Sequence, residues 1–196
     1  MALSHDGTEL PAAAAWRLVE AHDGFEVVFP RPGPAGHRFD GHSTGVEEGV
    51  PWSVTYSIEV DGDWRTRSAE VLSVSAEGER RLRLEGEDGR WRIDGRPTPE
   101  LDDCLDVDLE GSVLTNAFPL RRLALAVGER ADAPAAYVRV PSLAVERLEQ
   151  RYARLPDEDD RRRYDYESPD FGYRDVLVYD EHGLVVAYPG IAERVL

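Results

Sequence analysis

The sequence has no lysine, one cysteine and no long apolar run, and these absences limit what the protein can be. All 23 basic residues are arginine, against 39 Asp and Glu, so the 196 residues carry a formal net charge of −16. Because nucleic acids and anionic membranes are bound through basic side chains, this balance argues against a nucleic-acid partner. The acidic bias extends over the whole chain, and our hypothesis is that it reflects a high-GC genome or a halophilic, salt-loaded cytoplasm.

The cysteine and hydropathy patterns exclude further classes. With Cys104 alone, no intramolecular disulfide or cysteine-based metal cage can form, and we expect a small buried hydrophobe there. No segment approaches the roughly 20 apolar residues of a membrane span. The start "MALSHDGTEL" lacks the basic and apolar regions of a signal peptide. We therefore expect a cytoplasmic protein without stable membrane insertion.

Short segments rich in β-branched and aromatic residues recur between turn signals. The turns include Asp61-Gly62, Asp88-Gly89 and Asp94-Gly95, which suit tight hairpins. The segments predict strands of an antiparallel meander from about residue 25 to 93, closed later by a hairpin of "YRDVLVYD" and "LVVAYPG". The meander segments are "FEVVFP", "WSVTYSIEV", "RSAEVLSVSA", "RRLRLEG" and "GRWRIDG". No linker divides the chain, so we predict one domain over residues 1–196.

Three segments depart from the strand pattern. "PSLAVERLEQRYARLP" places its apolar residues at helical spacing between an N-cap serine and a proline, which predicts a single helix over Ser142 to Leu155. The charged stretch "LPDEDDRRRYDYE" is typical of an exposed loop. "GHRFDGHSTG" reads as a Gly-rich loop, and its His37 and His42 lack metal-ligand spacing. The fold class predicted is mainly β (α+β).

The stretch "DVDLEGSVLTNAFPLRRLAL" carries the densest polar chemistry. Asp106 and Asp108 alternate with apolar residues, so on a strand they share a face about 6.5 to 7 Å apart. That spacing is near the range of an inverting glycosidase pair. Alternatively, they are the ion-pair partners that Arg121 and Arg122 need if these arginines are buried. On a strand, one arginine of this pair would line the interior and the other would meet the outer surface or another subunit.

A second arginine pair lies in "DGDWRTRSAEVLSV". Arg65 and Arg67 project from one side of a predicted strand, next to Trp64. Such a pair either forms cross-strand ion pairs on a solvated face or faces a ligand.

The order of these motifs resembles a known family. Its central pattern is an Asp-Val-Asp-Leu step, then Thr115-Asn116, then a Leu-Arg-Arg-Leu step, within a match from Trp16 to Pro189. It is similar to the glycolipid-binding family that was long classed as a domain of unknown function. The resemblance implies a spiral β-roll, in which a long antiparallel sheet wraps around a single α-helix, and a homodimer. The family's role rests on a likeness of fold to acyl-chain carriers, so we transfer no catalytic residue and no cofactor.

Our leading hypothesis is a non-enzymatic protein that binds a lipid or glycolipid inside the roll. The walls would be Tyr56, Trp64 and Trp91, and a neutral glycosyl head group would suit the acidic chain. The polar residues expected to orient the head are Arg65, Arg67, Asp106, Asp108, Asn116, Arg121 and Arg122. The alternatives are an interaction module with a filled core and a glycoside or ester hydrolase that uses Asp106 and Asp108.

Overall fold

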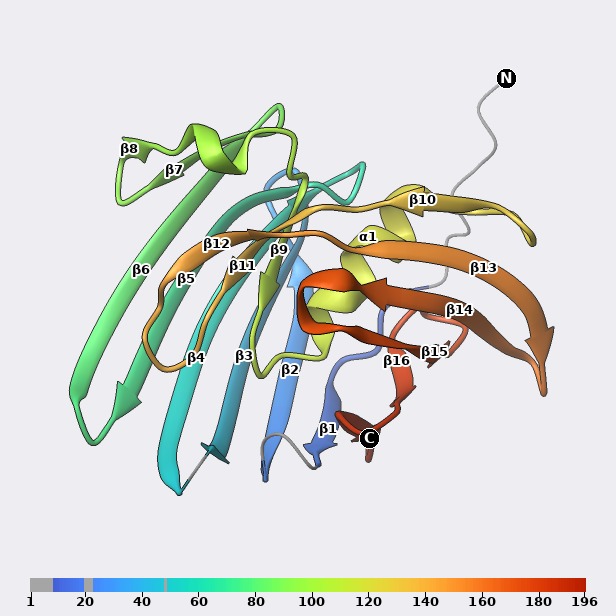
Figure 1. Ribbon diagram of the computed structural model, residues 1–196, viewed down its shortest axis with the longest axis horizontal. Helices are drawn as coiled ribbons and strands as arrows, with labels where there is room; N and C mark the ends of the chain where they lie inside the picture. Colours follow the sequence, from blue (N-terminus) through green and yellow to red (C-terminus); the bar gives the residue numbers. More distant parts are fainter. Residues whose placement is uncertain (1–8, 20–22, 48) are drawn as a thin grey trace.

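The computed structural model describes residues 9–19, 23–47 and 49–196, and most of these residues lie in one long curled sheet (Figure 1). Fourteen strands of the described residues form this sheet. Their spatial order is β10 (Arg130–Asp132), β13 (Arg151–Glu158), β14 (Arg161–Ser168), β15 (Tyr173–Tyr179), β16 (Val185–Tyr188), β17 (Ala192–Arg194), β1 (Ala14–Leu18), β2 (Gly24–Pro32), β3 (Gly36–Glu47), β4 (Val50–Asp61), β5 (Thr66–Ser75), β6 (Gly78–Glu87), β7 (Arg90–Ile93) and β8 (Arg96–Pro97).

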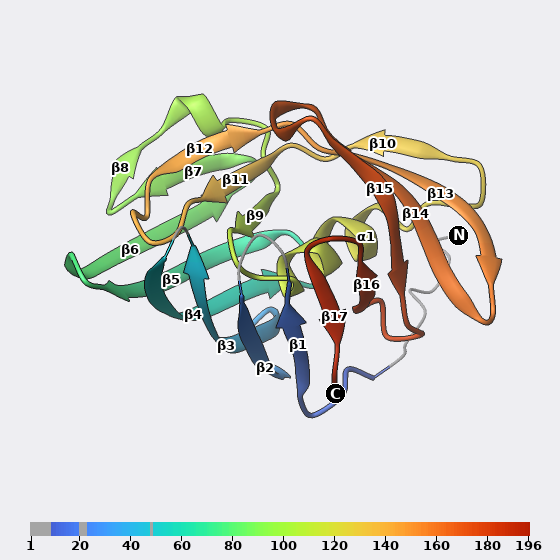
Figure 2. The ribbon, with the colours of Figure 1, turned by 60° about the horizontal axis from the view of Figure 1, so that its bottom comes forward.

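Strand β1 joins the two halves of the sheet, because it pairs antiparallel with β2 on one side and β17 on the other. The strand order ends at β8 and β10, so the sheet is curled but open. Figure 2 shows the curled sheet around the short helix α1 (Ala117–Leu123). A smaller sheet orders β12 (Val145–Leu148), β11 (Ala135–Val138) and β9 (Asp106–Leu109), and 3-10 turns occur at η1 (Pro99–Leu101), η2 (Leu114–Asn116) and η3 (Pro169–Phe171).

The predicted meander is confirmed from β2 to β7. Along β4, alternate residues from Trp52 to Val60 are buried on the concave face, whereas the residues between them are half-buried or exposed. The deep interior of the roll is filled by the sheet's own side chains and by α1. Its largest fully buried side chains include Trp16, Phe39, Phe118, Tyr152 and Tyr179. Cys104 is buried and free, as expected from the sequence.

Two glycines of β3 make room for aromatic rings of β4. Gly41 lies opposite Tyr56 and Gly45 lies opposite Trp52 in the antiparallel register. A Cβ atom on Gly41 would lie 2.1 Å from the Cζ atom of Tyr56, and one on Gly45 would lie 2.6 Å from the Trp52 ring. The rings therefore lie over the neighbouring strand, where any side chain would displace them.

The prediction of a helix over Ser142 to Leu155 is wrong, because this segment forms β12 and the start of β13. Leu148, Gln150, Tyr152 and Arg154 are all buried, which is the period of a strand. Two of these four positions are polar, so the strand alternation is hidden in the sequence. The roll does surround one helix, as the resemblance implied, but that helix is α1, whose residues we expected in a strand.

Two predicted loops are also strands. The Gly-rich segment "GHRFDGHSTG" lies within the twelve-residue strand β3. The charged stretch after Leu155 forms the β13–β14 hairpin, with a turn at Asp159 and Asp160, whose φ angles are 50° and 59°. Aspartate tolerates this left-handed conformation better than most residues do. None of the helices formed by the described residues is long and apolar enough to cross a membrane.

Candidate functional site

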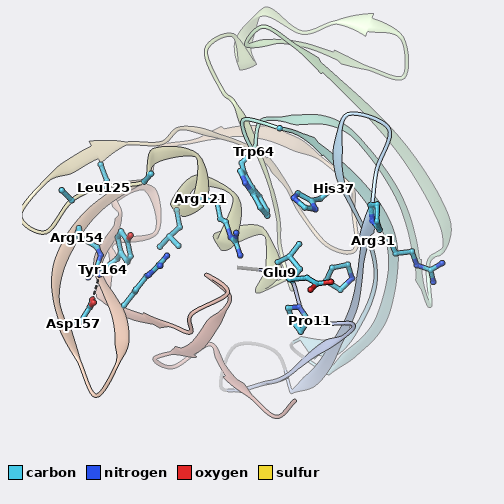
Figure 3. A pocket seen from close by; sticks show the side chains of 18 of the residues that line it. Glu9, Pro11, Arg31, His37, Trp64, Arg121, Leu125, Arg154, Asp157 and Tyr164 are labelled. Atoms are coloured by element: carbon cyan, nitrogen blue, oxygen red, sulfur yellow. Dashed lines mark hydrogen bonds and ion pairs between the residues drawn. The ribbon is translucent and has the colours of Figure 1, made fainter. Parts of the chain in front are cut away.

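A cavity of about 1140 Å³ opens at one end of the roll (Figure 3). We call it the arginine cavity. Its walls come from segments far apart in the sequence: the chain before β1, the β2–β3 turn, the β4–β5 turn, the C-terminal end of α1 with the loop after it, and the β13–β14 hairpin. The residues that line it are Glu9, Leu10, Pro11, Ala12, Pro30, Arg31, Pro32, His37, Gly62, Trp64, Leu120, Arg121, Ala124, Leu125, Ala126, Val127, Arg154, Asp157, Arg162 and Tyr164.

Trp64 lies in the cavity wall between Arg121 and His37 (Figure 3). The β4–β5 turn holds it with φ 63°, because Asp61 Oδ1 accepts hydrogen bonds from the backbone N–H groups of Asp63 (2.9 Å) and Arg65 (3.0 Å). The His37 ring stacks on Trp64 with centroids 4.8 Å apart, and the Arg121 guanidinium lies 4.6 Å from the Trp64 ring centroid. Burial and the nearby positive charge of Arg121 lower the pKa of His37, which keeps the imidazole neutral at pH 7.

Four arginines give the cavity a local positive charge. Arg31 comes from β2, Arg121 from α1, Arg154 from β13 and Arg162 from β14, whereas the acids that line the cavity are Glu9 and Asp157. In Figure 3, Arg121 lies beside Trp64, with Arg154 and Arg31 on opposite sides. The cavity is therefore a basic region in a chain of net charge −16, and it can attract an anion.

The arginines are held to different degrees. Arg154 is buried, contacts Asp157 and the carbonyl groups of Leu155 and Arg163, and lies 5.1 Å from the ring centroid of Tyr164. Arg121 donates to the carbonyl oxygen of His182. Arg31 has a side chain that is 65% exposed and lies 3.6 Å from Asp40. Arg154 and Arg121 are thus held by contacts within the fold, whereas the exposed Arg31 can adjust to a ligand.

Apolar residues form the rest of the cavity wall. They come from the chain before β1, the β2–β3 turn and the region around the end of α1. The larger ones are Leu10, Pro11, Pro30, Pro32, Leu120, Leu125 and Val127. The arrangement offers apolar surface to a hydrocarbon group and guanidinium groups to an acidic one.

Arg122 and Asp106 form a buried ion pair rather than a ligand site. Arg122 Nε lies 3.2 Å from Asp106 Oδ1 and Nη2 lies 2.5 Å from Oδ2. Burial raises the pKa of Asp106, and the Arg122 guanidinium opposes that rise. Adjacent residues of a helix point about 100° apart, so Arg121 reaches the cavity while Arg122 reaches β9. The predicted pairing is confirmed for Asp106, but Asp108 pairs with neither arginine.

Asp108 instead accepts hydrogen bonds from two neutral donors. Thr115 Oγ1 lies 2.8 Å from Oδ1, and Gln150 Nε2 lies 2.5 Å from Oδ2. Burial raises the pKa of Asp108 to about 6. Asp108 and Asn116 line a smaller pocket, which does not include Asp106. The two carboxylates therefore do not flank one cavity, as a glycosidase pair must.

The remaining predicted residues lie outside the arginine cavity. Trp91 is buried and its Nε1 donates to the carbonyl of Cys104 at 2.8 Å. Tyr56 is buried in the core, and neither Trp91 nor Tyr56 lines the arginine cavity. Arg67 lies at a register shift in β5, and its guanidinium is 4.0 Å from Asp61. Arg65 also lies outside both this cavity and the smaller pocket.

Sequence reasoning missed a fully buried acid, Glu26. Its Oε1 accepts hydrogen bonds from Tyr56 Oη (2.5 Å) and Ser112 Oγ (2.6 Å), and its Oε2 accepts one from the Val113 N–H (2.7 Å). Burial raises its pKa, against these hydrogen bonds. Glu26 fixes the segment before α1 onto the concave face of the sheet. Sequence alternation pointed the other way, because Glu26 lies between the apolar residues Phe25 and Val27, whereas the structure buries Glu26 with Val28 and leaves Phe25 exposed.

The fold and the cavity define a β-roll protein with an open, basic, partly apolar site at one end. The family model described as "Putative glycolipid-binding" matches residues 13–194, and the chain belongs to this family. The crystal structure of a DUF1089 family protein from Pseudomonas aeruginosa is similar, with 34% identity and a TM-score of 0.77 over 87% of this chain and 92% of that one. A search of curated proteins gave no match.

Proposed function

We propose that the protein binds a lipid or glycolipid with an acidic head group in the arginine cavity, without chemical conversion. The observation that carries the proposal is the juxtaposition of four arginines with an apolar wall in a cavity of about 1140 Å³. This volume is slightly above the range of roughly 300 to 1,000 Å³ that is typical of small-molecule sites. The family's description supports the same class of ligand.

The position of the cavity changes two parts of the sequence-based hypothesis. In our proposal the ligand binds at the open end of the roll, because side chains such as Phe39 and Phe118 fill the deep interior. The arginines favour a phosphate or carboxylate over the neutral glycosyl head that we expected, because a guanidinium forms strong paired hydrogen bonds with such anions. Trp64 and Tyr164 offer ring surfaces against which a sugar of an acidic glycolipid can lie.

The filled interior is the observation that favours the second candidate function, an interaction module. In that case the cavity would bind a partner's side chains rather than a lipid. The two functions differ in one measurable property, since only a lipid-binding protein gains affinity from a hydrocarbon tail.

Matched surfactants test the proposal. Isothermal titration calorimetry below the critical micelle concentration would compare dodecyl phosphate, dodecyl maltoside and the tailless methyl phosphate. We expect one dodecyl phosphate per chain, bound more tightly than either other probe, since it alone combines a tail with an acidic head. Arg31→Gln combined with Arg162→Gln should weaken it roughly tenfold or more, because each charge-assisted hydrogen bond contributes about 1.5 to 3 kcal/mol.

The control removes two arginines from the outer face of the sheet. Arg81 and Arg83 lie on β6, away from the arginine cavity, in exposed ion pairs with Glu79 and Glu70. Arg81→Gln combined with Arg83→Gln should leave dodecyl phosphate binding unchanged. Absence of binding by the wild-type protein, equal binding of methyl phosphate, or an equal loss in the control would each refute the proposal.

A further inference from the structure

The smaller pocket lies at the opposite end of α1 from the arginine cavity and has a different chemistry. We call it the tyrosine pocket. Its volume is about 260 Å³, which is too small for an acyl chain and suits a group of a few heavy atoms. It is lined by Leu18, Asp108, Leu109, Glu110, Gly111, Ser112, Val113, Asn116, Tyr137, Leu148, Tyr166, Ser168, Phe171, Tyr173, Tyr188 and Ile191.

Five of the residues that line this pocket are aromatic. Tyr166, Tyr173 and Tyr188 form a cluster with ring centroids 5.6 to 6.0 Å apart. Tyr137 and Phe171 form a second pair, 5.4 Å apart. The Tyr173 hydroxyl donates to the carbonyl of Pro189 at 2.8 Å, so this phenol is engaged within the protein. What the rings offer a ligand is chiefly their faces, which carry partial negative charge.

Asp108 supplies a carboxylate to the pocket without a positively charged partner. Its two contacts come from a hydroxyl and an amide, whereas Asp106, two residues earlier, has the guanidinium of Arg122. Glu110, the other acid of the pocket, accepts a hydrogen bond from the Val140 N–H at 2.6 Å and has Arg139 at 3.8 Å. The charge of Asp108 is therefore the one left unbalanced in the pocket.

The two sites differ in the sign of their charge. Among the described residues that line the tyrosine pocket there is no arginine or histidine, whereas four arginines line the arginine cavity. Arg139 already lies over Tyr137 and Phe171, 5.5 and 5.7 Å from their ring centroids, which shows that this aromatic pair accepts a cation. Aromatic faces with an unbalanced carboxylate are the surroundings in which proteins bind alkylated ammonium groups.

We propose that the tyrosine pocket binds a small alkylated ammonium group, held by the aromatic rings and by the carboxylate of Asp108. This site is independent of the lipid site in the arginine cavity, and either can fail without the other. The bound ammonium group would balance the charge of Asp108, just as the Arg122 guanidinium balances the charge of Asp106.

A charged and a neutral probe of the same shape test the proposal. Choline and 3,3-dimethylbutan-1-ol differ in replacing the ammonium nitrogen by carbon, so hydrophobic burial is the same for both. Titrations followed by NMR at pH 7.5 should show choline binding at least about tenfold more tightly, which corresponds to about 1.4 kcal/mol. Equal affinities, or no binding of choline, would overturn the proposal.

Two variants test whether the preference for choline over the neutral alcohol arises in the tyrosine pocket. Asp108→Asn should remove most of the preference for choline while leaving the affinity of the neutral alcohol unchanged. Asp157→Asn, which removes an acid of the arginine cavity instead, should alter neither affinity. If Asp157→Asn lowers choline affinity as much as Asp108→Asn does, the pocket is not the site and the proposal fails.

The wild-type protein provides a test that needs no variant. Choline affinity should rise between pH 5 and pH 7.5 as Asp108 ionises, since burial places its pKa at about 6. The affinity of the neutral alcohol should stay constant. The other titratable groups that interact with Asp108 are Asp106, Glu110, Tyr137, Tyr152, Tyr166, Tyr179 and Tyr188. A choline affinity that does not change over this range contradicts the assigned role of Asp108.

Discussion

At the scale of single residues, Asp106 and Asp108 show how much depends on the partner that the fold supplies. They share one face of β9, as the alternation predicted, and both are desolvated. One has an arginine and the other has only neutral donors. The sequence alone presents two equivalent aspartates next to two arginines. Which acid meets which base depends on the helical turn of α1, and we had expected a strand there.

Replacing Asp108 by asparagine should change how stability depends on pH. The native pKa of about 6 lies above the ordinary value of 3.8, so the folded state holds this proton more tightly and its contribution to stability is lost as pH rises from about 4 to 6. The loss approaches about 3 kcal/mol. Asp108→Asn removes this loss of stability, because asparagine does not ionise. The Gln150 amide can turn so that it either donates to or accepts from the new side chain.

Urea unfolding measured from pH 4 to pH 7.5 checks this prediction. As pH rises, the free energy of unfolding of Asp108→Asn should increase relative to that of the wild type, so that the variant is the more stable protein at pH 7.5. Parallel curves for the two proteins would show that Asp108 does not titrate in this range.

At the scale of elements, strand alternation predicted the meander well and failed where buried positions are polar. The four buried positions of the segment from Leu148 to Arg154 include Gln150, which donates to Asp108, and Arg154, which is held by carbonyl groups and Asp157. These partners come from other parts of the chain, so local hydropathy could not reveal them. The same holds for β3, where glycines look like a loop but are required by the rings of the next strand.

The packing of Tyr56 on Gly41 gives a prediction at this scale. Gly41→Ala places a Cβ atom 2.1 Å from the tyrosine ring, and overpacking of this kind typically costs about 1 to 3 kcal/mol. Gly62→Ala is a matched control, because the nearest atom to its Cβ is 3.8 Å away. Thermal unfolding should show a clear loss of stability in Gly41→Ala and little change in Gly62→Ala. Similar losses in both would mean that the contact with the Tyr56 ring does not set the cost, because the entropy lost by the unfolded chain on Gly→Ala favours folding in both variants.

At the scale of the whole molecule, the sequence predicted the class of fold but only part of each site. Trp64 and Arg121 of the predicted set meet in the arginine cavity, and Asp108 and Asn116 meet in the tyrosine pocket. Arg31, Arg154 and Arg162 were missed, because each lies in a segment that is unremarkable by itself. They converge only when the sheet curls and brings β2 and the β13–β14 hairpin to the same end of the roll (Figure 3).

Native mass spectrometry of protein purified gently from its own source would show whether the arginine cavity holds an amphipathic ligand. We expect a mass above the 21.9 kDa of the chain by that of one lipid, and release of this lipid in organic solvent should reveal an acidic head group. A mass equal to that of the chain alone, or of an unliganded oligomer, with nothing extracted, would rule out a lipid-binding protein and favour an interaction module.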